Sequence, residues 1–168
     1  NDSDFLAGRF RFFNSPADNA AGISNAGSLR SSFGGQIVLL GARVENSGDI
    51  QAPGGSVSLA AALSVDLVDT GLPNLAVHVS VPAGEALNLG TLAAAGGKVD
   101  VHAAIVSQQG LVRADSFGTD AAGQIVLQAS EQVTVAGRLD ASSANGHGGS
   151  VLVEADRVAL AGTAVIDA

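Results

Sequence analysis

Apolar residues recur at alternate positions in short runs along this chain, and a corner of two small residues precedes each run. The runs read Gln36-Ile-Val-Leu, Ser56-Val-Ser-Leu, Lys98-Val-Asp-Val, Gln124-Ile-Val-Leu and Ser150-Val-Leu-Val. This alternation is typical of a β-strand that buries one of its two faces. Successive corners start 20, 42, 26 and 26 residues apart. Self-similarity at that spacing predicts a solenoid whose coils bury their apolar sides by stacking on one another.

No long stretch of the chain shows the periodicity of an α-helix, which disfavours leucine-rich repeats. We therefore predict an all-β fold, a single-stranded right-handed parallel β-helix with an extra-helical hairpin. One inward row should hold a residue from each of five coils, namely Ile37, Val57, Val99, Ile125 and Val151. A second motif, Val44-Glu-Asn46-Ser-Gly48 and its copy around Asn25, marks sharp turns. We expect these two asparagines to stack as an amide ladder.

The spacing of 42 indicates an insertion of about 22 residues, counted from the regular repeat. Two alternating runs around Thr70-Gly-Leu-Pro-Asn74 predict a β-hairpin over 63 to 82 that packs outside the solenoid. The alternative is one degenerate coil, with Val65 and Val77 inside the tube. The predicted organisation of residues 1–168 as a single domain is an extra-helical strand or cap at 1–21, coils at 22–62, the hairpin insert at 63–89, and coils with long corners at 90–168.

Two of these later corners are longer than the others, at Asp115-Ser-Phe-Gly-Thr-Asp120 and Ser142-Ser-Ala-Asn-Gly-His147. Because they fall at the same corner of successive coils, we expect them to stack as loops on one flank. Loops on one side of a repeat array are where binding tends to be placed.

The segment Phe5 to Phe13 holds four of the six phenylalanines. We expect it to lie across or beside the first coil as an extra-helical strand in contact with Phe33, covering an end that would otherwise be prone to aggregation. The chain begins without Met and opens and closes in mid-pattern, so we expect a fragment of a longer solenoid.

Composition narrows the function classes. The formal net charge is −8, which argues against nucleic acid and against an anionic membrane surface as partners. No stretch approaches the roughly 18 to 20 apolar residues of a membrane span, so we expect no direct membrane insertion. Aromatic residues make up only 4% of the chain and cysteine is absent. The core must therefore come from Val, Ile, Leu and Ala.

Acidic clusters on one strand face would indicate a polysaccharide-cleaving β-helix. Asp66 and Asp69 are three apart in the predicted hairpin and so face opposite sides, Asp115 and Asp120 flank a loop, and Lys98, the sole lysine, follows a corner. We interpret all five as solvated surface.

His78, His102 and His147 are 24 and 45 residues apart, a spacing that fits no zinc site. Asn1-Asp2-Ser3 is a glycosylation sequon that we attribute to chance. We therefore predict no catalytic residue, no metal site and no cofactor, and we leave the ligand-binding residues unassigned.

Three segments carry a resemblance to a known family. They are Asp4-Phe-Leu-Ala-Gly-Arg-Phe-Arg-Phe-Phe13, the coil from Gly34 to Ile50, and the tail from Gly149 to Asp167. In these segments and in their order the chain resembles the amino-terminal secretion domain of two-partner-secretion exoproteins, a family that includes filamentous haemagglutinin and the high-molecular-weight adhesins.

The resemblance implies a right-handed β-helix at the start of a secreted adhesin fibre on a Gram-negative cell surface. It also implies recognition by the periplasmic domains of an Omp85-class outer-membrane transporter, and a host surface ligand for the full exoprotein. We expect a monomer without enzymatic activity. The family's Asn-Pro-Asn-Leu and Asn-Pro-Asn-Gly-Ile motifs lie upstream of the matching segment and are absent here, so no functional residue is carried over. The alternative is a β-helical carbohydrate-active enzyme or carbohydrate-binding module.

Overall fold

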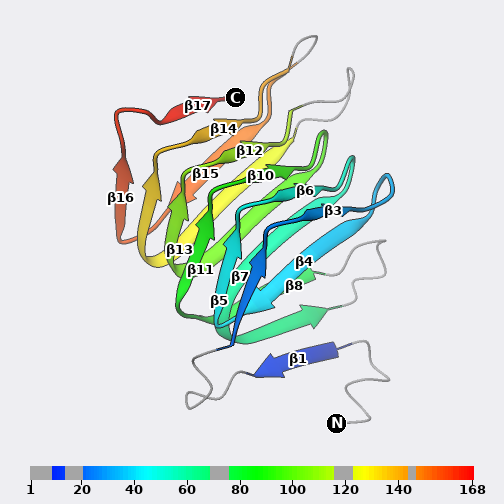
Figure 1. Ribbon diagram of the computed structural model, residues 1–168, viewed down its shortest axis with the longest axis vertical. Coiled ribbons are helices and arrows are strands. Elements are labelled where there is room, and N and C mark those ends of the chain that lie inside the picture. The colour runs from blue at the N-terminus through cyan, green and yellow to red at the C-terminus, as the bar shows by residue number, and fades with distance from the viewer. Residues whose placement is uncertain (1–8, 14–20, 69–75, 116–122, 144–146) are drawn as a thin grey trace.

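The computed structural model describes residues 9–13, 21–68, 76–115, 123–143 and 147–168, which form β-strands joined by turns (Figure 1). Most neighbouring strands run parallel, with strands of successive coils side by side. The predicted all-β, parallel β-helical fold is confirmed. Within the described residues, no helix is long and apolar enough to cross a membrane.

Each coil has three straight faces. The first face contains β4 (Gln36–Gly41), the first parts of β7 (Ser56–Val68), β11 (Lys98–Gln108) and β13 (Gln124–Val135), and β15 (Ser150–Glu154). Along the chain, each strand of this face follows a corner of two small residues. These strands are the predicted alternating runs.

The second face is built from strands that precede the asparagine turns. It contains β2 (Gly22–Asn25), β5 (Arg43–Asn46), β9 (Glu85–Asn88), the second parts of β11 and β13, and β16 (Arg157–Leu160). The third face contains β3 (Ser28–Arg30), β6 (Asp49–Gln51), β10 (Thr91–Ala93), β12 (Leu111–Arg113), β14 (Arg138–Asp140) and β17 (Val165–Asp167).

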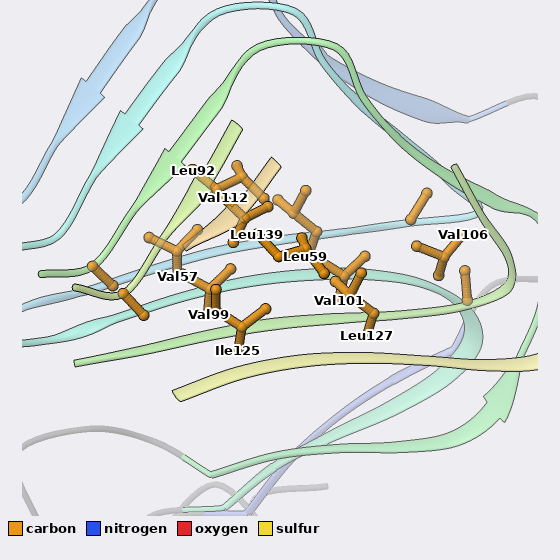
Figure 2. Packing of buried hydrophobic residues seen from close by; sticks show 14 of the residues in the cluster. Val57, Leu59, Leu92, Val99, Val101, Val106, Val112, Ile125, Leu127 and Leu139 are labelled. Carbon is orange, nitrogen blue, oxygen red and sulfur yellow. The ribbon is translucent and has the colours of Figure 1, made fainter. Parts of the chain in front are cut away.

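The inward rows form one continuous core. Strand register places the predicted row in order, as Ile37, Val57, Val99, Ile125 and Val151. Figure 2 shows labelled members of this core pointing from different faces into one enclosed space. Because the side chains repeat by position, each coil finds the same shape on its neighbour, and Val, Ile, Leu and Ala fill the interior.

The insert is a hairpin outside the tube, as predicted. Strand β7 runs on from the first face to Val68 and pairs antiparallel with β8 (Ala76–Pro82). Val65 is buried, and Val77 is partly buried against it, in a second apolar cluster separate from the main core, so the degenerate-coil alternative is wrong. The predicted turn at 70–74 lies outside the described residues. Strand β9 already belongs to the stack, so the insert ends before Glu85 and not at 89.

The phenylalanine-rich segment forms β1 (Arg9–Phe13), which is extra-helical as predicted. Its pairing partner is the hairpin and not the first coil: β1 runs antiparallel to β7, with Phe12 opposite Val65. The expected contact with Phe33 involves the side chains of the phenylalanine-rich segment, which lie outside what the structure describes. Strands β1, β7 and β8 thus make a three-stranded sheet on the outside of the solenoid (Figure 1).

A buried amide ladder crosses the coils at the turn between the second and third faces. Asn25 Nδ2 donates to Asn46 Oδ1 (2.8 Å), and Asn46 Nδ2 donates to Asn88 Oδ1 (2.8 Å). Asn88 Nδ2 then donates to Gln108 Oε1 (3.0 Å). The predicted pairing of Asn25 and Asn46 is confirmed, and the ladder extends two coils further. It ends where Val135 stands opposite Gln108, which leaves Gln108 Nε2 buried and without a hydrogen-bond partner.

Glycines beside the ladder set how closely the coils approach. A Cβ on Gly48 would overlap the carbonyl oxygen of Gly27, and a Cβ on Gly90 would overlap that of Gly48. These carbonyls accept hydrogen bonds from the next coil, for example Thr91 N–H to Gly48 O (2.9 Å). A side chain there would therefore separate the coils and break the bonds between them.

Val99 lies at the centre of the core, with a buried neighbour on each side in its row. Val99→Asp should lower the free energy of unfolding by about 3 to 5 kcal/mol, because it buries an unpaired charge. The matched control is Gln124→Asp, which adds the same carboxylate at an exposed position of the next strand. Near-native stability of Val99→Asp in urea denaturation would contradict the inward row.

The ladder makes a second, graded prediction. Asn46→Val leaves the Oδ1 acceptor of Asn88 unpaired and leaves Asn25 Nδ2 with its bond to Gly27 O (3.3 Å) alone. It should cost about 2 to 4 kcal/mol of stability. Gln108→Val removes an end member whose own donor is already unpaired, and Asn88 Nδ2 keeps its bond to Gly90 O (3.2 Å). Its cost should be clearly smaller. Equal costs in denaturant titrations would show that the ladder does not act as a connected network.

Candidate functional site

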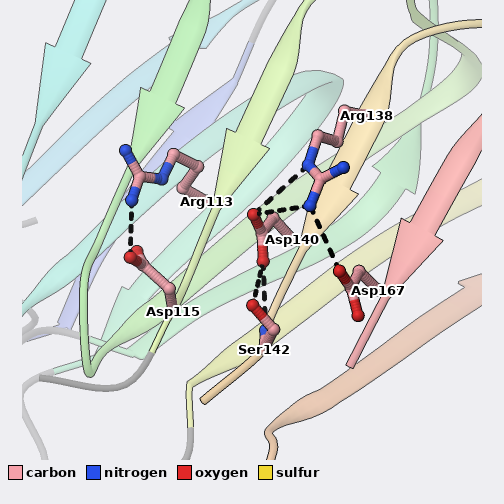
Figure 3. Close-up of polar contacts among 6 residues, drawn as sticks. All are labelled: Arg113, Asp115, Arg138, Asp140, Ser142 and Asp167. Atoms are coloured by element: carbon pink, nitrogen blue, oxygen red, sulfur yellow. Dashed lines mark hydrogen bonds and ion pairs between the residues drawn. The ribbon is translucent and has the colours of Figure 1, made fainter. Parts of the chain in front are cut away.

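A polar cluster lies on the outside of the third face, where β12, β14 and β17 end (Figure 3). Arg138 joins two coils: its guanidinium donates to Asp140 (3.1 Å) and to Asp167 (3.2 Å). In the preceding coil, Arg113 donates to Asp115 (2.6 Å). Every carboxylate in this cluster therefore has an arginine partner.

Asp140 shows what this cluster can do chemically. Burial alone would raise its pKa, but hydrogen bonds from Ser142 Oγ (2.6 Å) and Ser142 N–H (3.2 Å), together with Arg138, outweigh that effect and hold the pKa below its ordinary value. A general acid for glycoside cleavage needs a raised pKa. The cluster therefore has the properties of a structural ion-pair network between coils.

A groove of about 570 Å³ forms the second candidate, between β8 and the outward side of the first face. The hairpin folds back over this face and packs on Ala60 and Leu40, which leaves a channel along β8. Its polar lining includes Ser56, Ser58, Lys98, Asp100, His102 and, from β8, His78.

The charges of the groove are partly paired. Lys98 Nζ lies 2.9 Å from Asp100 Oδ1. Burial lowers the pKa of His102, and the nearby Lys98 lowers it further, while Asp100 and a hydrogen bond to Gln128 act in the opposite direction. His102 is thus held towards its neutral form beneath the hairpin.

Two histidines that sequence spacing separated border the same groove. His78 and His102 line the same groove, because His102 stands beside Ala60 in the strand register and the hairpin folds over that position. Sequence reasoning missed this groove, since only the docking of the hairpin creates it. The His78 side chain itself is exposed and stands opposite Asp66 in the hairpin. Across the described residues, no group of three His, Asp or Glu side chains is placed to hold a metal ion.

The remaining candidates are dispersed. Asp66 accepts a hydrogen bond from Ser80 Oγ (3.0 Å) on the exposed side of the hairpin, and His147 is exposed beside a corner. Asp69, Asp120 and Asn1 lie outside the described residues.

The two long corners both connect the third face to the first in successive coils. Their flanking strands lie side by side, β12 with β14 and β13 with β15. The ends of both loops are thus on one flank. Residues 116–122 and 144–146 themselves lie outside the described ranges.

Because the folded chain lowers the pKa of His102 from its ordinary 6.5, the unfolded chain binds more protons just below that pH. Stability should therefore rise with pH there, and should be lost as the pH falls through 6.5 towards the lowered folded value. His102→Gln should reduce this loss, measured as the difference in free energy of unfolding between neutral and mildly acidic buffer. His147→Gln, at an exposed corner, is the control. An unchanged pH dependence in His102→Gln would show that the hairpin does not desolvate this side chain.

Comparison with known proteins adds one detailed match. No protein-family model matches the chain, and no curated protein matches its sequence. Among solved structures, the chain is similar to the HMW1 secretion domain from Haemophilus influenzae, with a TM-score of 0.90 and 34% sequence identity.

That match covers 99% of this chain and 45% of the HMW1 secretion-domain structure, so the chain spans less than half the length of that relative. The likeness extends over the coils, the hairpin and the amino-terminal strand alike. It confirms the resemblance predicted from the sequence: over 99% of its length the chain is similar to part of the secretion domain of a two-partner-secretion adhesin.

Proposed function

We propose that this chain is a non-enzymatic recognition domain of an exported bacterial adhesin. An Omp85-class transporter in the outer membrane of a Gram-negative bacterium binds it through periplasmic domains and passes the exoprotein to the cell surface. There the coils begin a β-helical fibre whose distal parts bind a host ligand. The observation that carries the proposal is the 34% identity to a solved secretion domain over 99% of the chain.

The polar groups of the chain support a role without catalysis. The carboxylates of the third-face cluster are paired with arginines, and the pKa of Asp140 is lowered and not raised. Nothing in this cluster favours the carbohydrate-active alternative. The alternative needs an acid with a raised pKa beside a free carboxylate.

We place the recognition surface on the extra-helical sheet, at the open edge of β8. The coils stack without it, since Ala83 N–H donates to Ala61 O (3.1 Å) and closes the base of the hairpin. Among the described residues β8 pairs with β7 alone, so its other edge is open beside the groove. An open strand edge beside polar groups suits an extended segment of a partner.

Binding should be measured between the 168-residue chain and the purified periplasmic domains of an Omp85-class transporter that exports a high-molecular-weight adhesin. Val81→Glu places a charge on β8 and should weaken the affinity by about tenfold, or roughly 1.4 kcal/mol. Leu152→Glu is the matched control, because Leu152 is 50% exposed on the outward side of β15, between two residues that pack on the core.

The outcomes separate two claims. Absence of any binding by the unmodified chain would contradict the proposed function. Binding that Val81→Glu and Leu152→Glu leave equally strong would retain the function and overturn the position of its surface.

A further inference from the structure

The point where the chain returns from the hairpin to the coil stack differs from the same point in other coils. In the next two coils, β11 and β13 each run from the first face into the second as one strand. In the first coil a single residue, Ala42, separates β4 from β5. Strand β9 instead follows the hairpin, whose second leg β8 lies outside the stack. On its entering side, the position of β9 therefore depends on contacts with its neighbours β5 and β11.

The inward side of β9 is held through Asn88, which is 2% exposed. Its side chain accepts a hydrogen bond from Asn46 Nδ2 on β5 (2.8 Å) and donates one to Gln108 Oε1 on β11 (3.0 Å). Its backbone carbonyl accepts from Gln109 N–H (2.8 Å). Displacing this amide would leave buried polar groups without partners, which is costly in free energy. Asn88 therefore ties β9 to the coils on both sides.

The outward side of β9 is held through Glu85. Its carboxylate lies 3.5 Å from the Arg43 guanidinium on β5 and accepts a hydrogen bond from Ser107 Oγ on β11 (3.1 Å). These groups are partly exposed, so each contact by itself is weak. Together with Asn88, however, they join both sides of β9 to both of its neighbours.

The backbone is seated closely at the return itself. Gly84 has a φ of +63°, and a Cβ on it would overlap the carbonyl oxygen of Ala42 in the preceding coil. Gly84 O accepts a hydrogen bond from Ile105 N–H in the next coil (3.0 Å). Ala83 N–H donates to Ala61 O (3.1 Å) across the base of the hairpin. The last residues of the excursion are thus fixed to the stack before β9 begins.

The hairpin beyond this base is a separate packing unit. Its apolar residues form a cluster around Val65 that is distinct from the main core. The pairing of β7 with β8 shifts register twice close to the base, between Ala62 and Val65, and such bulges interrupt a strand ladder locally. Units with separate cores open with separate free energies. The sheet can therefore move without the coils, provided that the return stays in place.

We propose that Glu85 and Asn88 form a clamp that confines movement of the extra-helical sheet to the sheet itself. When the sheet shifts or opens, the clamp keeps β9 bonded to β5 and β11, and the coils stay closed. This inference rests on the proposed function for the cause of such movement, which is a partner bound at the edge of β8. The experiment needs no partner, so either proposal can fail without the other.

Hydrogen exchange of backbone amides, followed by mass spectrometry, tests the clamp. Val65→Ser changes a buried member of the hairpin cluster and should speed exchange in β8 by about tenfold or more. With the clamp intact, exchange from Leu87 to Thr91 should stay within about threefold of that in the unmodified chain. In a Glu85→Ala/Asn88→Ala background, adding Val65→Ser should speed exchange in that segment by about tenfold.

Asn25→Ala/Arg30→Ala is the matched control background. It removes another ladder amide and another arginine–carboxylate pair, both away from the return. There, Val65→Ser should leave exchange in β9 unchanged. Faster exchange of β9 in Val65→Ser with the clamp intact would overturn the proposal, and so would an equal response of the clamp and control backgrounds.

Two further variants keep the test decisive if Val65→Ser leaves the sheet docked or the double clamp variant does not fold. Replacing residues 64–81 with Gly-Gly removes the sheet outright, next to the paired residues Ala62 and Pro82. With the clamp intact, circular dichroism should show folded coils and β9 should stay protected. Adding Glu85→Ala alone should speed exchange of β9 in this shortened chain, by less than the double change does. Loss of β9 protection before the clamp is altered, or no effect of Glu85→Ala, would contradict the clamp.

Discussion

Hydrogen bonding between successive coils is the interaction on which this structure depends. A single coil of about 20 residues encloses no core of its own, and its strand N–H and C=O groups find their partners in the coils above and below. The turns follow the same rule, as Ser47 N–H and Leu89 N–H donate to the asparagine carbonyls one coil earlier. Stacking in register therefore satisfies the backbone and buries the aliphatic rows in the same step. Glycine at the turns permits the close approach that both require.

Stacking in register restricts which residues can stand at the inward positions, and it leaves the outward positions of the three faces freer to vary. Inward positions repeat by type, so the core is uniform and the amide ladder can cross four coils. Outward positions are free to vary, and they carry the Arg138 network and the groove beside the hairpin. The hairpin is the part that leaves the stack and forms a small apolar cluster of its own. Recognition is placed most readily on such an element, because the stack does not need it for closure.

Much of the fold could be predicted from the sequence because its signals are local and repeated. Alternation fixed the inward row from Ile37 to Val151, and the irregular spacing located the hairpin. The partner of β1 could not be predicted, since antiparallel pairing with β7 depends on how an excursion folds back. The ladder's extension to Gln108 was missed because a glutamine takes the place of asparagine there. The groove bordered by His78 and His102, and the bond from Arg138 to Asp167, likewise arise only when segments far apart in sequence come together.

Engineered cysteines test the central claim most directly, since the natural chain has none. Asp49 and Thr91 stand opposite each other in neighbouring coils although the hairpin separates them in sequence. Adjacent strands lie about 4.8 Å apart, within disulfide reach. The account predicts that the folded Asp49→Cys/Thr91→Cys variant oxidises completely, and that Asp49→Cys/Leu111→Cys, one coil further at about 9.6 Å, stays reduced. Oxidation of the second pair in preference to the first would contradict the stacking of these coils around an extra-helical hairpin.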